Sequence, residues 1–359
     1  MNNKIKPIAI HLPQFHSFEE NDKWWGKGFT EWTNVTKAKP RFKDHYQPHL
    51  PADLGFYDLR LEEARLAQIA LAKEFGIFGF CYYHYWFNGK RLMHEPLDRM
   101  LKNEKEDFPF MFCWANENWT RRWDGQASEI LIKQDYSDKD HTEHVKFLCQ
   151  NVFKDKRYIK IAGSPVFVIY KASIIPDVKN FINNANIIAQ EYNFPSIYFL
   201  CMDNFITEDA LTLGFQGSIH FQPDHRYLKK VPENLFGRVL NRLKIRKSFL
   251  MNNHYQLYED YVLSVLKYNH TVSKNVFPGI TPGWDNSSRV KNGALILDKA
   301  NPEIFRTWLR HIINTQTKKD SDENFIFINA WNEWAEGNHL EPCRKWGTEF
   351  LKAIKEEIK

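Results

Sequence analysis

The sequence predicts an α/β fold, a (β/α)8 TIM barrel with long loops after its strands. Eight short apolar runs recur along the 359 residues, amphipathic helical patterns separate them, and polar and aromatic residues follow each run. None of the runs alternates cleanly between apolar and polar residues, which is typical of strands buried on both faces of a parallel sheet. A doubly wound open sheet is the alternative, but no G-x-G-x-x-G follows the first run, which weakens a dinucleotide-binding version of it.

The eight strands are predicted from the apolar runs, of which the sixth and the seventh are weak and the seventh is broken by Pro278. In chain order the strands are 7–12, 77–83, 110–114, 166–170, 197–201, 217–221, 276–280 and 325–328. The helices are predicted from apolar residues at helical spacing, and Gly76 is a suitable C-cap for the first. They span 58–75, 92–101, 141–152, 177–191, a short segment near 208–213, 255–268, 302–314 and 346–358.

We expect residues 1–359 to form one (β/α)8 catalytic domain with extended loops at about 14–55 and 227–253. Hydrophobic residues make up 43% of the chain and charged residues 26%, and the net charge is +5, as in ordinary water-soluble proteins. The basic cluster at 238–247 is a plausible contact for phosphates or anionic lipid, but a solvated loop or helix face is the favoured explanation.

Cysteine usage and the amino terminus both favour a cytoplasmic protein. The five cysteines include no C-x-x-C pair, which favours small buried side chains over a disulfide or zinc framework. No long apolar core follows the first charged residues, and no run approaches the roughly 18 apolar residues of a membrane span.

The segment 328–337 (INAWNEWAEG) is the most informative part of the chain. It follows the last predicted strand and places Glu333 and Glu336 among two tryptophans. Two carboxyl groups at the end of a buried strand suit the making or breaking of a glycosidic bond, one as proton donor and the other as base or nucleophile. Without the rest of the chain, a solvated helix face would explain the same spacing.

The other strand ends support the catalytic interpretation, because the carboxyl ends of barrel strands meet at one mouth. Aromatic side chains there could stack on sugar faces, and 15% of the chain is aromatic. Polar ones could bond sugar hydroxyls, and Glu31 or Glu117 could replace one member of the glutamate pair. The predicted substrate-binding residues are His11, Glu31, Tyr83, His84, Trp114, Asn116, Glu117, Trp119, Trp284, Asp285, Trp331 and Asn332.

Other chemistries have weaker support. We expect no metal and no cofactor, because H-E-x-x-H and H-x-H are absent, and His84, His220 and His225 would have to converge in space. No G-x-S-x-G follows a strand, which disfavours a serine nucleophile. We expect no nucleic-acid partner, because carboxylates among the aromatic residues would repel phosphates. Two D-x-D matches, at 138–140 and 320–322, lie in polar stretches away from the strand ends.

The chain resembles the WbsX-type family of bacterial polysaccharide gene clusters. The matching motifs spread over nearly the whole chain: GFTEWTN at 28–34, HYQPH at 45–49, YYHYWFNG at 82–89, CWANENWT at 113–120, GWDN at 283–286 and NAWNEWAEG at 329–337. The barrel is also similar to glycoside hydrolase family 99, the endo-α-mannosidases and endo-mannanases. This more distant likeness depends mainly on Glu-Trp-x-Glu after the last strand.

The family 99 resemblance implies separate roles for the two glutamates. Glu333 would be the base acting on the sugar 2-hydroxyl, and Glu336 the acid and then the base, in a retaining route through a 1,2-anhydro sugar. Ala335 stands where that family usually has histidine, so the sugar and the tuning of Glu336 are left open.

We therefore expect a glycoside hydrolase-like enzyme that cleaves an oligosaccharide or polysaccharide of the bacterial surface. The alternatives are a glycosyltransferase of O-antigen or capsule biosynthesis and a non-catalytic glycan-binding barrel. Peripheral contact with a membrane-linked glycan is compatible with either enzyme, and the oligomeric state is not predicted.

Overall fold

The computed structural model of the chain describes residues 5–121, 126–229, 253–268, 275–290, 292–316 and 323–358. Its main sheet has the order β12-β10-β9-β8-β4-β2-β1-β16-β13 with parallel pairing throughout that path. Its strands are β1 (Lys6–His11), β2 (Gly79–Phe87), β4 (Phe110–Trp114), β8 (Ser164–Ile169), β9 (Tyr198–Met202), β10 (Gly217–Ile219), β12 (Val276–Phe277), β13 (Gly279–Ile280) and β16 (Phe325–Ile328).

The two short strands around Pro278 close the barrel. β12 pairs with β10 on one side, whereas β13, one residue further on, pairs with β16 on the other. Pro278 cannot donate a ladder hydrogen bond, so it falls where the chain passes from one neighbour to the other. The eight predicted strands and the barrel are thus confirmed.

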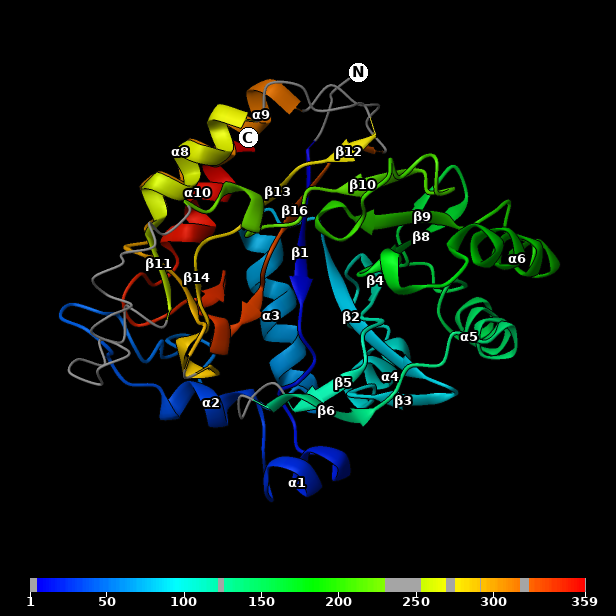
Figure 1. Cartoon of the computed structure of the whole chain (residues 1–359), viewed down its shortest axis with the longest axis horizontal. Helices are drawn as coiled ribbons and strands as arrows, with labels where there is room; N and C mark the ends of the chain where they lie inside the picture. Colours follow the sequence, from blue (N-terminus) through cyan, green and yellow to red (C-terminus); the bar gives the residue numbers. More distant parts are fainter. Residues whose placement is uncertain are drawn as a thin grey trace, which may run out of the picture.

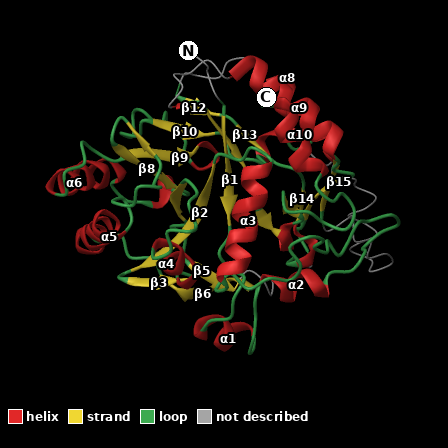
Figure 2. Ribbon diagram, turned by 180° about the vertical axis from the view of Figure 1, so that it is seen from behind, coloured by secondary structure: helices red, strands yellow, loops and turns green. Residues whose placement is uncertain are grey.

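Helices cover the outside of the barrel, and Figure 2 shows α5 and α6 side by side on one flank. The helices are α1 (Glu19–Trp25), α2 (Glu31–Lys37), α3 (Glu62–Glu74), α4 (Glu95–Leu101), α5 (Asp138–Asn151), α6 (Val178–Glu191), α8 (Tyr258–Tyr268), α9 (Pro302–Gln316) and α10 (Glu349–Glu357). Small pairings outside the main path involve β3 (Lys90–Leu92), β5 (Trp119–Arg121), β6 (Gln126–Ile132), β7 (Lys160–Ile161), β11 (His254–Leu257), β14 (Trp284–Asp285), β15 (Leu295–Asp298), β17 (Asn332–Glu333) and β18 (Asn338–His339).

Several predicted helices and loops need correction. The segment 208–213 forms turns, because Gly214 follows at once and one turn cannot nucleate a helix. The segment 255–268 begins as strand β11 and becomes helical only at Tyr258. The expected loop at 14–55 contains α1 and α2. Most of the second expected loop, 230–252, and with it the basic cluster, lies outside the described residues.

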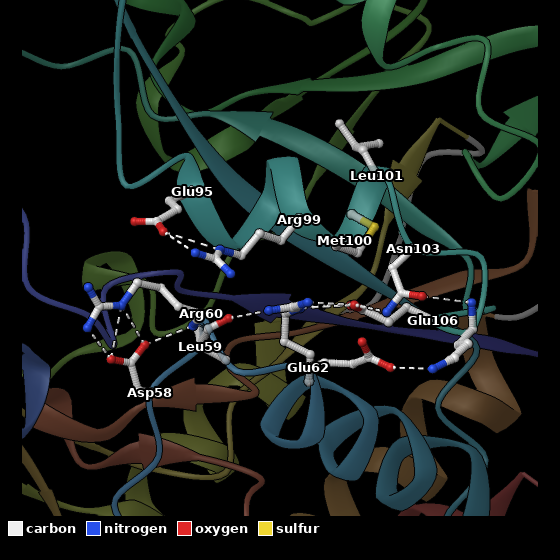
Figure 3. Close-up of polar contacts among 12 residues, drawn as sticks. Asp58, Leu59, Arg60, Glu62, Glu95, Arg99, Met100, Leu101, Asn103 and Glu106 are labelled. Atoms are coloured by element: carbon white, nitrogen blue, oxygen red, sulfur yellow. Dashed lines mark hydrogen bonds and ion pairs between the residues drawn. The ribbon is translucent and has the colours of Figure 1, made fainter.

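Buried ion pairs fix the helical layer. Arg65 of α3 donates three hydrogen bonds to the Glu106 carboxylate, and Asn103 donates a fourth (Figure 3). The guanidinium of Arg157 bonds the carbonyls of Met100 and Leu101 at the end of α4. These contacts satisfy carbonyls that a helix end would otherwise leave unpaired.

The carboxyl ends of the barrel strands define the mouth. In Figure 1 the arrow of β1 points toward the end of the molecule where α1, α2 and the β5–β6 pair lie. The segments that follow the barrel strands therefore meet there, as in other barrels of this architecture. No helix in the described part of the chain is both long and apolar enough to span a bilayer.

Candidate active site

The two glutamates of the last strand end lie on a short β-hairpin. β17 and β18 pair antiparallel, with Glu333 opposite Asn338, and the 3-10 turn η8 (Trp334–Glu336) connects them. Gly337 closes this turn at φ 58°, a left-handed conformation that suits glycine. Glu333 thus lies on β17 just before the turn, and Glu336 is the last residue of the turn. The two glutamates are therefore not on the solvated face of an α-helix.

One arginine joins two buried carboxylates, of Glu31 and Glu333, and the half-buried carboxylate of Glu336. Arg289 Nη2 lies 2.6 Å from Glu31 Oε1 and 3.1 Å from Glu333 Oε2, and Arg289 Nη1 lies 2.6 Å from Glu336 Oε1. We call Glu31, Glu333, Glu336 and Arg289 the carboxylate cluster. Glu31 also accepts the backbone N–H of Ala335 at 2.9 Å, which fixes the centre of the turn.

Burial and mutual repulsion control the protonation of the cluster. Burial raises the pKa of Glu333 well above its ordinary value, and the neighbouring Glu336 raises it further. Burial also raises the pKa of Glu336, whereas Arg289 opposes the shift in both. Because the two carboxyl groups interact, they titrate as a pair, and the upward shifts favour retention of a proton by the pair.

A fourth carboxylate, that of buried Glu341, holds Trp334 in place between Glu333 and Glu336. Glu341 Oε2 accepts the Trp334 indole N–H at 2.6 Å and the Tyr57 hydroxyl at 2.8 Å. Gln68 donates to Glu341 Oε1 at 2.7 Å, and the indole stacks on His339 at 3.7 Å between ring centroids. Burial raises the pKa of Glu341 to about 7, although all three donors favour its ionised form.

The segment 45–49 (HYQPH) anchors the loop that carries Arg289. His45 Nε2 and the Gln47 amide contact the same oxygen of Asp285, at 2.6 and 2.8 Å. The N–H of Ser287 is bound by the second Asp285 oxygen, which fixes the loop that carries Arg289. Both carboxylate oxygens of Asp285 thus have hydrogen-bond partners within the protein, and these bonds position the loop.

Aromatic and polar side chains line the opposite part of the mouth. Tyr83, Tyr85 and Tyr170 form a chain of ring contacts, and burial together with the Glu333 carboxylate raises the pKa of Tyr85. Trp119 packs on the Tyr85 ring at 5.4 Å.

Asn116 and Glu117 join this part of the mouth through one lysine. The Asn116 amide exchanges two hydrogen bonds with the Lys171 backbone, and Glu117 pairs with its ammonium group at 2.9 Å. Of the predicted residues, Glu31 shares Arg289 with the glutamate pair, and burial, Tyr170 and the Glu333 carboxylate raise the pKa of Tyr83. Trp119 contacts Tyr85, and Asn116 and Glu117 contact Lys171, in the neighbouring part of the mouth.

Other predicted sugar-binding residues lie in the core. Trp114 is fully buried and packs against His144 and Phe181 under α5 and α6. Trp331 is fully buried against Phe80. Their rings face structural neighbours, which does not fit the sugar platform suggested by their sequence positions.

Three predicted polar contacts also have internal partners. His84 Nε2 lies 3.0 Å from His144 Nε2. His11 bonds Gln68, and Asn332 bonds the Leu12 backbone. These side chains fix the strands beneath the mouth, whereas half-buried Trp284 remains next to Asp285 on β14.

Arg289 and Glu341 are the main residues that sequence reasoning missed. Arg289 follows the GWDN motif by three residues, and Glu341 follows Glu336 by five. Their closeness to these motifs in the sequence is the one feature that could have indicated a place in the site. Of the two D-x-D matches, Asp140 accepts the Trp86 indole N–H inside the fold, and 320–322 lies outside the described residues.

Fold and site together define a (β/α)8 barrel protein with a largely buried carboxylate cluster at the carboxyl ends of its strands. The chain belongs to the glycosyltransferase WbsX family, whose sequence profile matches residues 7–354.

Two relatives, each called uncharacterized protein WxcX, come from Xanthomonas campestris pv. campestris strains ATCC 33913 and B100. They are 33% identical over 359 residues and 34% identical over 354 residues. The alignments cover 98% of this chain and 49% of each relative, so the chain spans about half of their length.

Solved structures share the fold at low sequence identity. A glycoside hydrolase-like protein superposes with a TM-score of 0.62 at 14% identity, covering 100% of this chain and 95% of that one. The GH99 endo-alpha-mannosidase from Bacteroides thetaiotaomicron superposes with a TM-score of 0.55 at 12% identity, covering 100% and 97%.

Proposed function

We propose that this chain is a glycoside hydrolase-like enzyme acting on a glycan of bacterial surface polysaccharide metabolism, with Glu333 and Glu336 as its catalytic pair. The carboxylate cluster is the observation that carries the proposal. Two carboxyl groups with raised pKa, both held by one guanidinium at a barrel mouth, offer a proton donor and a base within one site.

The family resemblance supplies the order of steps. Glu333 takes the proton of the sugar 2-hydroxyl, whose oxygen attacks the anomeric carbon while Glu336 protonates the departing glycosidic oxygen. Water then opens the 1,2-anhydro sugar at the anomeric carbon. Glu336 receives the proton of the water, and Glu333 returns its proton to the 2-oxygen.

Arg289 has to loosen its contact with Glu336 before this chemistry. A guanidinium at 2.6 Å favours the ionised carboxylate, whereas a general acid must be protonated. The contact with Glu333 is longer, at 3.1 Å, so the resting cluster favours the proton on Glu333. Substrate binding would then draw Arg289 away from Glu336 and let the proton move to the acid position.

The tyrosine and tryptophan rings at the mouth are the proposed sugar platforms. Among the predicted aromatic residues, Trp119 and Trp284 are half-buried and Tyr83 is 7% exposed, and the half-buried Glu117 adds a carboxylate at the mouth. The similar endo-α-mannosidase fold makes α-mannosides the first oligosaccharides to test.

A glycosyltransferase is the second candidate, since the family carries that description. The same pair could serve it, with one carboxylate deprotonating an acceptor hydroxyl. Three assays separate the proposals: oligosaccharides alone, an activated nucleotide-sugar with an acceptor, and equilibrium binding of the same oligosaccharides. Cleavage of oligosaccharides supports the hydrolase, turnover only with the activated donor supports the transferase, and binding without turnover supports a glycan-binding barrel.

The roles within the pair can be separated by the leaving group. An aryl glycoside with a good leaving group needs little proton donation, so Glu336→Gln should retain far more activity on it than on an oligosaccharide. Glu333→Gln should lose both activities together. The reverse pattern would exchange the two assignments.

A further inference from the structure

A second polar cluster lies at the ends of two neighbouring barrel strands. β9 and β10 pair in parallel with Met202 opposite Ile219, so the residues that follow, Asp203 and His220, leave the sheet side by side. Asp224 stands four residues further on and caps the 3-10 turn η4 (His225–Tyr227). Phe221, next to His220, contacts the Tyr170 ring at 5.7 Å, which places this cluster at the same mouth as the glutamate pair.

The three side chains converge on one point. One ligand atom from each of Asp203, His220 and Asp224 lies within 4.8 Å of the others, and His220 Nε2 is 3.5 Å from Asp224 Oδ2. His220 is only 6% exposed, and its Nε2 atom has only the long 3.5 Å contact with Asp224. Asp203 Oδ1 has no hydrogen-bond partner. A buried polar atom without a close partner is costly, so Asp203 Oδ1 and the loosely paired His220 Nε2 indicate that this cluster lacks a ligand.

The cluster already binds a positive group. Arg226 Nε lies 2.6 Å from Asp224 Oδ2, and Arg226 Nη2 lies 3.0 Å from Asp203 Oδ2. One guanidinium offsets only one of the two carboxylate charges. The Arg226 side chain is 54% exposed, so it can turn toward solvent without leaving an apolar pocket.

We propose that Asp203, His220 and Asp224 bind a divalent transition-metal cation, such as Mn²⁺ or Zn²⁺, in exchange for the Arg226 guanidinium. Imidazole nitrogen and carboxylate oxygen are ligands that these cations accept. Three protein ligands leave coordination positions for water or for an anionic group of a substrate.

This proposal departs from the expectation that no metal is bound. That expectation depended on the absence of close histidine motifs, whereas here the ligands come from two strands and lie up to 21 residues apart. The site is separate from the carboxylate cluster, so its test does not depend on the proposed hydrolase activity.

The experiment is a titration of metal-stripped protein with Mn²⁺, followed by electron paramagnetic resonance and calorimetry. We expect one saturable site, with nitrogen coupling from an imidazole in the spectrum. Asp203→Asn should weaken binding at least about tenfold. His220→Asn should remove the nitrogen coupling. Arg226→Gln should tighten binding, since the competing cation is gone, an effect that a purely structural cluster would not give.

The segment 58–60 offers a matched control. Asp58 accepts the Arg60 backbone N–H and pairs with its guanidinium (Figure 3). Asp224 makes the same two contacts with Arg226. Asp58 does not belong to any metal-ligating group among the described residues. Asp58→Asn and Arg60→Gln should therefore leave Mn²⁺ affinity unchanged.

Circular dichroism identifies variants that have lost the fold. The nitrogen coupling in the spectrum of the wild-type protein tests the imidazole ligand without any substitution. Absence of saturable binding of both Mn²⁺ and Zn²⁺ at millimolar concentration would overturn the proposal. Binding that survives both Asp203→Asn and His220→Asn would overturn it as well.

Discussion

Replacing Arg289 with methionine should make the stability of the protein strongly dependent on pH. The substitution keeps a long apolar stem but removes the single charge that balances Glu31, Glu333 and Glu336. Removing one partner of a buried ion pair typically costs about 3–5 kcal/mol, because the remaining charge stays desolvated. Arg289 is only 12% exposed, so solvent screens this loss little.

The pH dependence follows from the direction of the carboxyl pKa shifts. Arg289 lowers the pKa of both Glu333 and Glu336, so its loss raises them further above their unfolded values. The variant therefore binds more protons when folded than when unfolded, and its stability falls as pH rises. Relative to wild type, we expect the full loss at pH 8 and a clearly smaller one at pH 5.

Urea unfolding of both proteins at pH 5 and pH 8 measures this difference. Arg60→Met is the matched control, because the Arg60–Asp58 pair is about one-third exposed and should contribute no more than about 1 kcal/mol at either pH. A loss below about 1 kcal/mol in Arg289→Met, or an equal loss at the two pH values, would refute the assigned role of Arg289.

Three further changes test the support of the hairpin. Burial raises the pKa of Glu341 to about 7, so the stability it contributes is complete below its unfolded pKa and is lost as pH rises through 7. Glu341→Gln should flatten this part of the stability–pH curve, measured by urea unfolding, and an unchanged slope would contradict the assignment. Gly337→Ala should cost about 1–2 kcal/mol, because φ is 58° and the new Cβ would lie 3.1 Å from that of Asp285. Thermal unfolding checks it, with exposed Glu63→Ala on α3 as control. Trp334→Phe should cost about 1–3 kcal/mol by leaving Glu341 without its indole donor, and urea unfolding that matches wild type would argue against that bond.

The barrel could be predicted because its signals are local. Continuous apolar runs such as Phe325–Ile328 suit strands buried on both faces. Even the weak run around Pro278 forms strands, β12 paired with β10 and β13 paired with β16. The turns at 208–213 were less predictable, because a single apolar turn does not show whether a helix will continue.

The candidate site could be predicted only in part. Proximity to a strand end identified Glu333 and Glu336, and Glu31 was named as an alternative member of the pair, but the sequence could not show which way a side chain points. Neighbouring residues on β2 face opposite sides, so Tyr83 reaches the mouth while His84 packs against His144. Arg289 was missed because an arginine in a loop has no periodic signal, and only the fold brings it to Glu31, 258 positions away.

The rate of glycosidic cleavage in the two glutamine variants tests the central claim most directly. With an oligosaccharide that the wild-type protein cleaves, Glu333→Gln and Glu336→Gln should each lose about 10²–10⁴-fold in rate. Glu63→Gln, an exposed change on α3, should leave the rate unchanged. Wild-type rates in both site variants would contradict the assignment of Glu333 and Glu336 as the catalytic pair.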